Sequence, residues 1–289
     1  MCRFPNRADA TPVTGYRAQS PMDTFRTRYG PVALVSGSAQ GIGLEFARAL
    51  ATRGLDLVLV DVRDDLLPGV AAELARTHGV EAHAVVLDVG ERAAGDRFRE
   101  LAEQHEIGLG IANAAIGGVG PFLSESLDAH RARLAVNCGG ALSLCHALSP
   151  AMLARGRGGL ILLSSMAGLQ GTGGVASYSA TKAYDLALAE ALWYELKPGG
   201  VDVVAVLPGS TDTPGMRSSH PREDRVALMP AEQIAAEGLD ALGRVPRHIC
   251  GEANQKVAEA LAKLPLEQLL QVMGDQMARL YENPDPGGD

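Results

Sequence analysis

The sequence predicts an α/β fold in which one doubly wound, parallel sheet carries helices on both faces. Short apolar runs alternate with amphipathic, helix-forming stretches from Pro31 onward, which is the pattern of a buried parallel sheet. A glycine-rich turn follows the first of these runs, and polar residues follow later runs where each strand should end. The chain has 289 residues, of which 46% are hydrophobic, and this is enough for one large domain.

Residues 1–29 differ in composition from the rest of the chain. They are rich in Arg and interrupted by Pro and Gly, and they contain no apolar stretch of the kind found in secretory signals. The scarcity of acidic residues is compatible with a transit peptide, but a disordered extension or a misplaced start codon fits better. We therefore expect a disordered extension at 1–29, a main α/β domain at 30–252, and a C-terminal helical extension with a disordered tail at 253–289.

The first predicted strand, Pro31–Val35, leads into a turn that contains Gly37, Gly41 and Gly43, and a helix follows at Leu44–Arg53. Glycines allow a close backbone approach, and the free N–H groups and dipole at a helix N-terminus favour an anion. A purely structural turn is the alternative, but the place of this turn in a β-α-β unit favours a dinucleotide phosphate. The arrangement is that of a Rossmann-type sheet, for which we expect about seven strands in the order 3-2-1-4-5-6-7.

The second predicted strand, Asp56–Val60, ends at an acidic residue, Asp61. A carboxylate in this position accepts hydrogen bonds from the adenine ribose and repels a 2′-phosphate, so it favours NAD over NADP. Arg63 lies two positions further on and offers a phosphate contact instead, which keeps NADP possible. A further alternative is that Asp61 simply caps a turn.

Two asparagines lie in apolar surroundings in the middle of the chain. A third strand is predicted at Ala82–Leu87, and a fourth at Ile107–Ala115 contains Asn113. A buried amide needs hydrogen-bond partners, so we expect Asn113 in a polar network. Asn137 lies in the long helical segment Ser124–Leu153, where it either holds a kink or positions a water in a proton path.

The stretch from Gly159 to Lys182 places polar side chains at the end of a fifth strand. Leu160–Leu163 is an apolar run that ends in Ser164 and Ser165, and the four glycines that follow make a helix there unfavourable. Because ligands bind beyond the carboxyl ends of parallel strands, both serines lie at the depth of a binding site.

A helix predicted from Ala176 to Lys197 carries Tyr178 and Lys182 on one face, since they are four positions apart. A tyrosine hydroxyl ionises near pH 10, and bringing this ionisation to neutrality takes roughly 4 kcal/mol. An ammonium about 4 Å away supplies about this much at an effective dielectric of about 20. The pair can therefore pass a proton at physiological pH, provided that the amine is not paired with an unrelated carboxylate.

The rest of the chain completes the sheet and adds helices. A sixth strand at Val201–Leu207 ends in the polar segment Pro208–Thr213, and the irregular stretch Pro214–Met229 after it is either a mobile lid or a surface loop. The remaining predicted elements are a helix at Pro230–Leu242, an edge strand at Arg247–Cys250, helices at Ala253–Leu264 and Leu266–Tyr281, and a disordered tail at Asn283–Asp289.

The composition excludes several classes of function. A net charge of −8 opposes a nucleic-acid or anionic-membrane surface as the main partner, and no apolar stretch is long enough for a membrane span. The four cysteines lack paired spacing and the seven histidines lack metal-ligand spacing, so we expect no disulfide framework and no metal site. Reduced cysteines are typical of a cytoplasmic protein, which is the location we expect.

Several separated motifs, taken together, resemble those of the short-chain dehydrogenase/reductase family over roughly residues 31–251. The stretch Ser36-Gly37-x-x-x-Gly41-x-Gly43 resembles the family's cofactor loop, and Asp88 its adenine contact. Ala112–Ala115 resembles its Asn-Asn-Ala-Gly element, and Pro208-Gly209 with Thr213 its nicotinamide segment. The residues that fall on its catalytic tetrad, with the family's spacing between serine and tyrosine, are Asn137, Ser165, Tyr178 and Lys182.

The resemblance implies a single-domain, NAD(P)-dependent oxidoreductase that moves a hydride between the nicotinamide and a secondary alcohol or ketone. Tyr178 would be the general acid/base, Lys182 would acidify its phenol and bind the nicotinamide ribose, and Ser165 would hold the substrate oxygen. Asn137 would position a water in the proton relay. The expected cofactor contacts are Gly37, Ser38, Gln40, Gly41, Ile42, Gly43, Asp61, Asp88, Val89, Asn113, Ala114, Ala115, Tyr178, Lys182, Pro208, Gly209, Thr211 and Thr213.

Two departures from the family pattern bear on these expectations. Ala112 and Ala115 replace the first Asn and the Gly of the fourth-strand element, which changes the local hydrogen bonding. Gln40 stands where many NADP-using relatives carry a basic residue, which supports NAD as the preferred cofactor.

Alternatives remain for the substrate, the class of function and the assembly. A hydrophobic or lipid-like substrate is expected because Ala and Leu are frequent around the cleft. An NADP-linked 3-oxoacyl or steroid-type reductase is the alternative enzyme, and a non-catalytic dinucleotide-binding sensor or scaffold is the alternative from another class. Ala183, Ala187 and Ala191 form a small-residue helix face that either packs on the sheet or, as the resemblance implies, joins a homodimer or homotetramer.

Overall fold

The computed structural model describes residues 21–219 and 228–281, and its centre is a parallel sheet of seven strands. The strand order is β3-β2-β1-β4-β5-β6-β9, which confirms the predicted Rossmann-type order with β9 as the seventh strand. The strands are β1 (Val32–Ser36), β2 (Asp56–Asp61), β3 (Ala82–Val86), β4 (Ile107–Ala112), β5 (Gly158–Leu163), β6 (Val201–Leu207) and β9 (Arg247–Ile249). Two short strands, β7 (Thr211–Asp212) and β8 (Met229–Pro230), pair separately.

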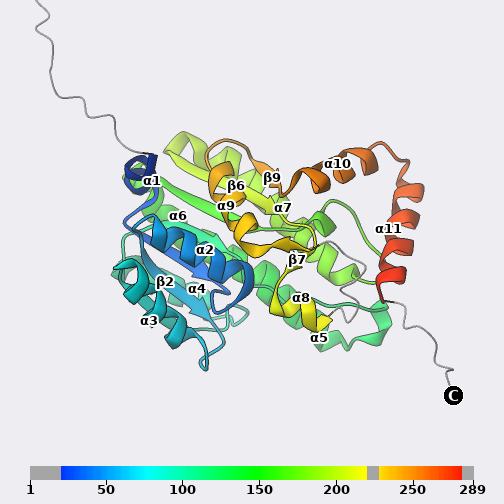
Figure 1. The fold of residues 1–289 in the computed structure, drawn as a ribbon, viewed down its shortest axis with the longest axis horizontal. Coiled ribbons are helices and arrows are strands. Elements are labelled where there is room, and N and C mark those ends of the chain that lie inside the picture. The colour runs from blue at the N-terminus through cyan, green and yellow to red at the C-terminus, as the bar shows by residue number, and fades with distance from the viewer. Residues whose placement is uncertain (1–20, 220–227, 282–289) are drawn as a thin grey trace, which may run out of the picture.

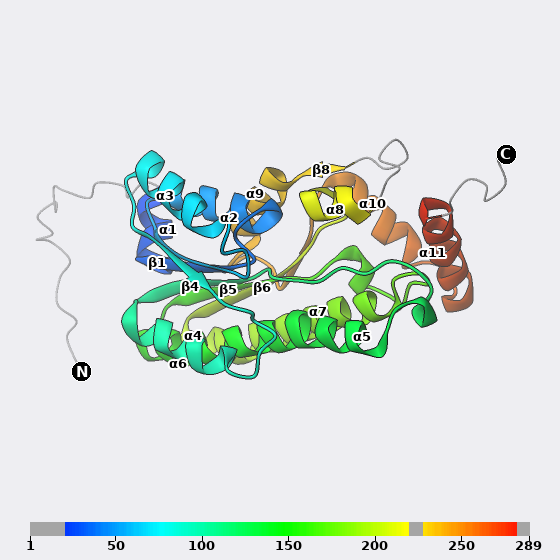
Figure 2. The same cartoon turned by 90° about the horizontal axis from the view of Figure 1, so that it is seen from below.

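Helices cover both faces of the sheet, as the sequence predicts (Figure 1). Figure 2 shows the two helical layers on opposite sides of the strands. One layer contains α2 (Gly41–Thr52), α3 (Leu67–His78) and α9 (Ala231–Ala241), and the other contains α4 (Ala94–Gln104), α5 (Leu127–Leu134), α6 (Ala141–Arg155) and α7 (Ala176–Leu196).

Burial on both faces explains why the central strands are continuous apolar runs. Successive side chains of a strand point to opposite faces of the sheet. In β1, Ala33 and Val35 join the core under α2 and α3, whereas Val32 and Leu34 join the core under α4 and α6. The central strands therefore need apolar residues along their length, whereas the edge strands β3 and β9 are partly exposed and include His83, Arg247 and His248.

The first helix, α1 (Pro21–Tyr29), corrects the prediction that all of residues 1–29 form a disordered extension. Phe25 packs against the core, and Tyr29 is 5% exposed, with its hydroxyl donating a hydrogen bond to Asp202 at 2.7 Å. These two aromatic side chains give the segment enough apolar surface to fold onto the protein. Residues 1–20 lie outside the described part of the chain.

The predicted long helical segment Ser124–Leu153 is divided by a change of helical geometry. The short helix η1 (Phe122–Ser124) precedes α5, and a π-helical turn, η2 (Ala135–Gly140), joins α5 to α6. A π-helical turn accommodates an extra residue in a helix and occurs frequently at functional sites. This turn contains Asn137.

Two further helices, α10 (Glu252–Leu261) and α11 (Leu266–Tyr281), follow β9, and Figure 1 shows α11 at the opposite end of the molecule from α1. The stretch Pro214–Met229 contains α8 (Pro214–Ser219) and the first residue of β8. Residues 220–227 and the predicted tail at 283–289 lie outside the described residues, so the lid and the disordered tail stay predictions. Among the helices described, none combines the length and apolarity needed to cross a bilayer.

Candidate active site

A cavity of about 1660 Å³ opens at the carboxyl ends of the parallel strands, where open α/β sheets bind ligands. The predicted site residues that line it are Gly37, Gln40, Gly41, Ile42, Asp61, Asp88, Val89, Asn113, Ala114, Ala115, Ser165, Tyr178, Pro208, Gly209, Thr211 and Thr213. Four other predicted site residues do not line the cavity: Ser38, Gly43, Asn137 and Lys182. The structure therefore brings the predicted residues together, but some of them support the site from outside the cavity.

The turn between β1 and α2 is shaped to hold an anionic group. Gly37 has a φ of +68°, in the backbone region that favours glycine. A Cβ atom on Gly43 would lie 2.0 Å from the carbonyl oxygen of Gly37, so the two backbone segments approach only because residue 43 has no side chain. The cap residue of α2, Gln40, makes no side-chain hydrogen bond to the helix, which leaves the first backbone N–H groups for a ligand. These features fit a dinucleotide phosphate.

Asn113 ties the end of β4 to this turn. Its Nδ2 donates hydrogen bonds to the carbonyl oxygens of Ser36 and Gly37, both at 3.0 Å. The Asn113 amide thus lies in the polar network that its apolar surroundings predict. The buried Ser38 hydroxyl donates to the carbonyl oxygen of Val60 at 3.3 Å, so Ser38 holds the turn against β2 and does not face the cavity.

At the end of β2, the Asp61 carboxylate accepts hydrogen bonds from the backbone N–H groups of Ala39 at 2.9 Å and Arg63 at 3.1 Å. Asp61 therefore caps the local turn, but an ionised carboxylate has about four acceptor sites and keeps capacity for ribose hydroxyls. The Arg63 guanidinium is held by Asp65 in two hydrogen bonds of 3.0 and 3.1 Å. An acidic group thus faces this part of the cavity, and the nearby cation is already paired.

The two serines after β5 have different surroundings. Ser164 is buried, and its hydroxyl donates to the backbone carbonyl oxygen of Lys182 at 2.6 Å, which fastens the strand end to α7. Ser165 lines the cavity, and its hydroxyl accepts a hydrogen bond from the Ala167 N–H at 3.1 Å at the start of η3 (Met166–Gly168). Ser165 is therefore the serine that can meet a ligand.

The Asn137 side chain is 1% exposed, and its polar atoms are engaged by the protein. Its Oδ1 accepts a hydrogen bond from the Ile116 N–H at 2.7 Å, and its Nδ2 donates to the Ile116 carbonyl at 3.1 Å and to Thr181 Oγ1 at 2.9 Å. The Thr181 hydroxyl donates in turn to the carbonyl oxygen of Tyr178 at 2.8 Å. The Asn137 side chain therefore braces the π-helical turn against the β4 loop and α7, and its water-holding role stays a prediction.

Tyr178 lines the cavity, and the Nζ atom of Lys182 lies 6.0 Å from the centroid of the Tyr178 ring. The Lys182 side chain is buried, and its Nζ donates hydrogen bonds to the Leu163 carbonyl at 2.6 Å and to Asp185 Oδ2 at 3.0 Å. The sequence argument for an acidic Tyr178 phenol required an amine without a carboxylate partner, so the pairing with Asp185 shows that this part of the prediction is wrong. Because Asp185 carries the opposite charge beside it, the ammonium does not act on the Tyr178 phenol unopposed.

A family model described as short chain dehydrogenase matches residues 31–224, which is more than half of the chain. The chain belongs to the short-chain dehydrogenase/reductase family. It is an NAD(P)-dependent oxidoreductase of alcohols and ketones. A 7β-hydroxysteroid dehydrogenase from Collinsella aerofaciens is 29% identical over 237 residues, which cover 80% of this chain and 90% of that protein. A sorbitol dehydrogenase from Cereibacter sphaeroides is 34% identical over 186 residues, which cover 63% of this chain and 71% of the relative.

Solved structures agree with this assignment. A structure described in a study of 7β-hydroxysteroid dehydrogenase stereoselectivity has a TM-score of 0.80 at 27% identity. The match covers 86% of this dehydrogenase and 98% of the other chain. A short-chain dehydrogenase from Sphingobium yanoikuyae, solved in complex with NADPH, has a TM-score of 0.70 at 26% identity. The match covers 82% of this chain and 97% of the Sphingobium chain.

Part of the cavity wall of the dehydrogenase comes from residues that its sequence did not single out. Side chains of α10 and α11 line the cavity, including Asn254, Leu269, Met273 and Met277. A Cβ atom on Gly174, in the loop before α7, would lie 3.7 Å from Met277 Cβ, so α11 packs near the start of the Tyr178 helix. The extension predicted at 253–289 therefore contributes to the site. The amphipathic pattern of α11 predicts a packed face, but it does not say what the face packs against.

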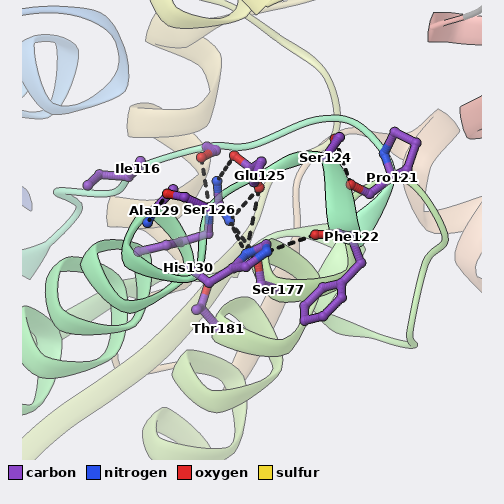
Figure 3. A network of polar contacts seen from close by, with 12 residues as sticks. Ile116, Pro121, Phe122, Ser124, Glu125, Ser126, Ala129, His130, Ser177 and Thr181 are labelled. Atoms are coloured by element: carbon purple, nitrogen blue, oxygen red, sulfur yellow. Dashed lines mark hydrogen bonds and ion pairs between the residues drawn. The ribbon is translucent and has the colours of Figure 1, made fainter.

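A buried arginine network also anchors the loop between β4 and α5 of the dehydrogenase. Arg133 donates hydrogen bonds to both carboxylate oxygens of Glu125, at 2.7 and 3.0 Å, and to the Gly117 carbonyl at 2.9 Å. Arg133 also donates to the hydroxyl of Ser177, the residue before Tyr178. Figure 3 shows Glu125, His130 and Ser177 converging in this network. The network thus connects the cavity-lining loop to the start of the Tyr178 helix.

Replacing Arg133 with Met is expected to raise the KM for a carbonyl substrate by about tenfold and to leave the Kd for NADH within about twofold. The Met side chain keeps part of the buried volume, but the loop loses its anchor at Gly117. Steady-state kinetics and NADH fluorescence titration measure the two effects. The matched control is Arg131→Met on the same helix, because the Arg131 side chain is 68% exposed. An unchanged KM in Arg133→Met would contradict the anchoring role.

One cluster in the dehydrogenase places potential metal-ligand atoms of Glu237, His248 and Cys250 within 4.8 Å of one another. Contacts within the protein account for this cluster. His248 Nε2 lies 2.7 Å from the Glu237 carboxylate, which also accepts a hydrogen bond from the Gly251 N–H at 3.0 Å. Burial raises the pKa of the Cys250 thiol to about 12, so this sulfur is protonated near neutral pH.

Proposed function

We propose that this dehydrogenase exchanges a hydride between NAD and a secondary alcohol or ketone that has a hydrophobic or lipid-like body. The observation that carries the proposal is that a single cavity is lined by the dinucleotide cradle and by Ser165 and Tyr178. Apolar side chains such as Met216, Leu269 and Met273 line the same cavity, which favours an apolar substrate.

The chain's own residues would orient the reactants and supply the proton. The backbone around Gly37 and Gly41 would hold the cofactor phosphates, and Asp61 would accept hydrogen bonds from the ribose. The nicotinamide supplies or takes up the hydride when it is bound. The Ser165 hydroxyl would hold the substrate oxygen. The Tyr178 hydroxyl would donate a proton to that oxygen in reduction, and the Tyr178 phenolate would take a proton from it in oxidation.

Asp61 supports NAD as the preferred cofactor. Its carboxylate would repel a 2′-phosphate, and the Arg63 guanidinium beside it is already paired with Asp65. The Sphingobium yanoikuyae relative was solved with NADPH, so the family membership by itself does not decide between the two cofactors.

Replacing Asp61 with Asn is expected to raise the ratio of kcat/KM for NADPH to that for NADH by about tenfold, which corresponds to about 1.4 kcal/mol of removed repulsion. Asn keeps a side-chain oxygen for the Ala39 N–H and loses only the acceptor for the exposed Arg63 N–H, so the turn should remain folded. The control is Asp64→Asn, which removes the same charge from an exposed neighbour. If both variants keep the cofactor ratio of the wild type, Asp61 does not set the preference.

A steroid-type reductase is the second candidate, because 7β-hydroxysteroid dehydrogenases are among the relatives that cover most of this chain. The cavity of about 1660 Å³ also exceeds the roughly 300–1,000 Å³ of common small-molecule sites, which leaves room for a bulky substrate beside a dinucleotide. Rates measured over a panel of keto-steroids, 3-oxoacyl thioesters and short ketones, with NADH and with NADPH, separate the candidates. Turnover of the short ketones alone would contradict the proposed substrate class.

We infer that the chain associates through α7, as the family resemblance implies. Ala183, Ala187 and Ala191 are exposed in this chain, so the small-residue face of α7 does not pack on the sheet. Tyr194 on the same helix is 78% exposed, and Leu142 on α6 is 47% exposed. These exposed side chains support a homodimer or homotetramer formed through this surface.

A further inference from the structure

The Lys182 ammonium shares a buried site with a carboxylate one helical turn further along α7. The side chains of Lys182 and Asp185 are 4% and 3% exposed, and Nζ lies 3.0 Å from Asp185 Oδ2. The other carboxylate oxygen, Oδ1, is buried and has no hydrogen-bond partner among the described residues. The contact of Asp185 with Lys182 is therefore the polar interaction that holds this side chain.

At the buried position of Asp185, an apolar side chain would cost less free energy than a carboxylate. Burial raises the pKa of its carboxyl, and the neighbouring Lys182 opposes that rise. A buried carboxylate with one unsatisfied oxygen is unfavourable unless an opposite charge compensates it. Packing alone thus does not account for an acidic residue here, whereas its position beside Lys182 does.

Asp185 also acts electrostatically on three other titratable groups. They are Tyr184 on the same helix, Cys138 on η2 and Cys145 on α6. Burial raises the pKa of the Cys138 thiol to about 11 and that of the Cys145 thiol to about 12, so both are uncharged near neutral pH. Burial also raises the pKa of the Tyr184 phenol. These three groups therefore add no charge beside Asp185 near neutral pH.

We propose that Asp185 is a positioning residue that holds the Lys182 ammonium near Tyr178 and offsets part of its charge, and thereby sets the pH range in which Tyr178 transfers a proton. Two contacts, one to the Leu163 carbonyl and one to Asp185, fix the Nζ atom in place. The carboxylate also opposes the effect of the ammonium on the phenol, because the two charges lie side by side. This inference rests on the proposed function, in which Tyr178 is the proton-transfer group.

Replacing Asp185 with Asn tests the effect of its negative charge separately from that of its hydrogen bond with Lys182. An Asn side chain keeps an oxygen that can accept the hydrogen bond from Lys182, but it removes the negative charge. The phenolate form of Tyr178 then becomes more favourable. Asp185 lies seven residues from Tyr178, which is about 10 Å along a helix, so removal of one charge at an effective dielectric of about 20 should lower the titration midpoint by about one pH unit.

The midpoint is measured without substrate, from the phenolate absorbance difference between each protein and its Tyr178→Phe counterpart. Where a substrate is available, the acidic limb of the kcat/KM profile for alcohol oxidation should move to lower pH by the same amount. Asp185→Leu is the second variant, because a buried apolar side chain avoids the cost of an unpaired amide. It should show the same direction of shift and a lower kcat, since Lys182 loses its second contact.

The matched control is Asp240→Asn, which makes the same charge change at an exposed residue of α9, on the opposite face of the sheet. It should leave the midpoint unchanged. If folded Asp185→Asn and Asp185→Leu both keep the wild-type midpoint, the positioning role is overturned, even if their melting temperatures fall. If the midpoint shifts but the wild type turns over no alcohol or ketone, the inference on Asp185 holds and the proposed function fails.

Discussion

Replacing Tyr178 with Phe is expected to lower kcat by about 10³-fold while the Kd for NADH stays within about twofold. The phenol is the group on the cavity wall that can exchange a proton with a substrate oxygen next to Ser165. Phe keeps the ring, so the cavity wall and the packing of α7 should be preserved. Stopped-flow or steady-state measurement of NADH oxidation, together with NADH fluorescence titration, gives both quantities.

The matched control for this experiment is Tyr194→Phe, which removes a hydroxyl from the same helix at a position that is 78% exposed. This control should retain wild-type kcat and wild-type affinity for NADH. A Tyr178→Phe protein that keeps more than about a tenth of the wild-type kcat would show that another group transfers the proton.

Replacing Gly43 with Ala is expected to weaken NADH binding by about 100-fold, equivalent to about 2.7 kcal/mol. The added Cβ atom would lie 2.0 Å from the Gly37 carbonyl oxygen and 2.6 Å from Asn113 Nδ2. The first of these contacts is with backbone, so no side-chain rotation relieves it and the turn itself must shift. The free energy of unfolding should also fall, by about 3 kcal/mol, at the upper end of the usual cost of overpacking. Isothermal titration with NADH and denaturant unfolding measure the two effects.

Gly69 provides the control for that substitution, because a Cβ atom added there meets no atom within 4 Å. Gly69 lies inside α3, where Ala is favoured over Gly by about 1 kcal/mol. Gly69→Ala should therefore bind NADH normally and unfold at a higher denaturant concentration. Normal NADH binding by Gly43→Ala would mean that the turn around Gly37 does not hold the cofactor.

The strands follow directly from the sequence, because a parallel sheet covered on both faces requires continuous apolar runs. Their order follows from the Rossmann-type arrangement to which the glycine-rich turn belongs. β6 (Val201–Leu207) has the predicted bounds, and the other strands of the main sheet differ from prediction by only a few residues at their ends. The position of Ser165 beyond β5 and the network around Asn113 follow from the same reasoning. A polar residue just beyond a buried strand lies at the depth where ligands bind, and a buried amide needs partners.

The features that the sequence did not predict depend on contacts between distant segments. α1 folds because Phe25 and Tyr29 pack against the core, and composition alone does not predict this packing. α11 brings Met273 and Met277 to a cavity formed mainly by residues 37–216. Asp185 shares a helix with Lys182, but its burial and its contact with Nζ depend on how α7 packs against α6 and the sheet.

Transfer of deuterium from reduced NAD labelled at nicotinamide C4 to a ketone tests the central claim most directly. We predict that the wild-type enzyme forms an alcohol with one deuterium at the carbinol carbon, detected by mass spectrometry, and that Tyr178→Phe binds the labelled cofactor but forms almost no labelled product. Saturable NADH binding by the wild type, with no labelled alcohol from any ketone of a broad panel, would contradict the proposed exchange and leave only a dinucleotide-binding protein.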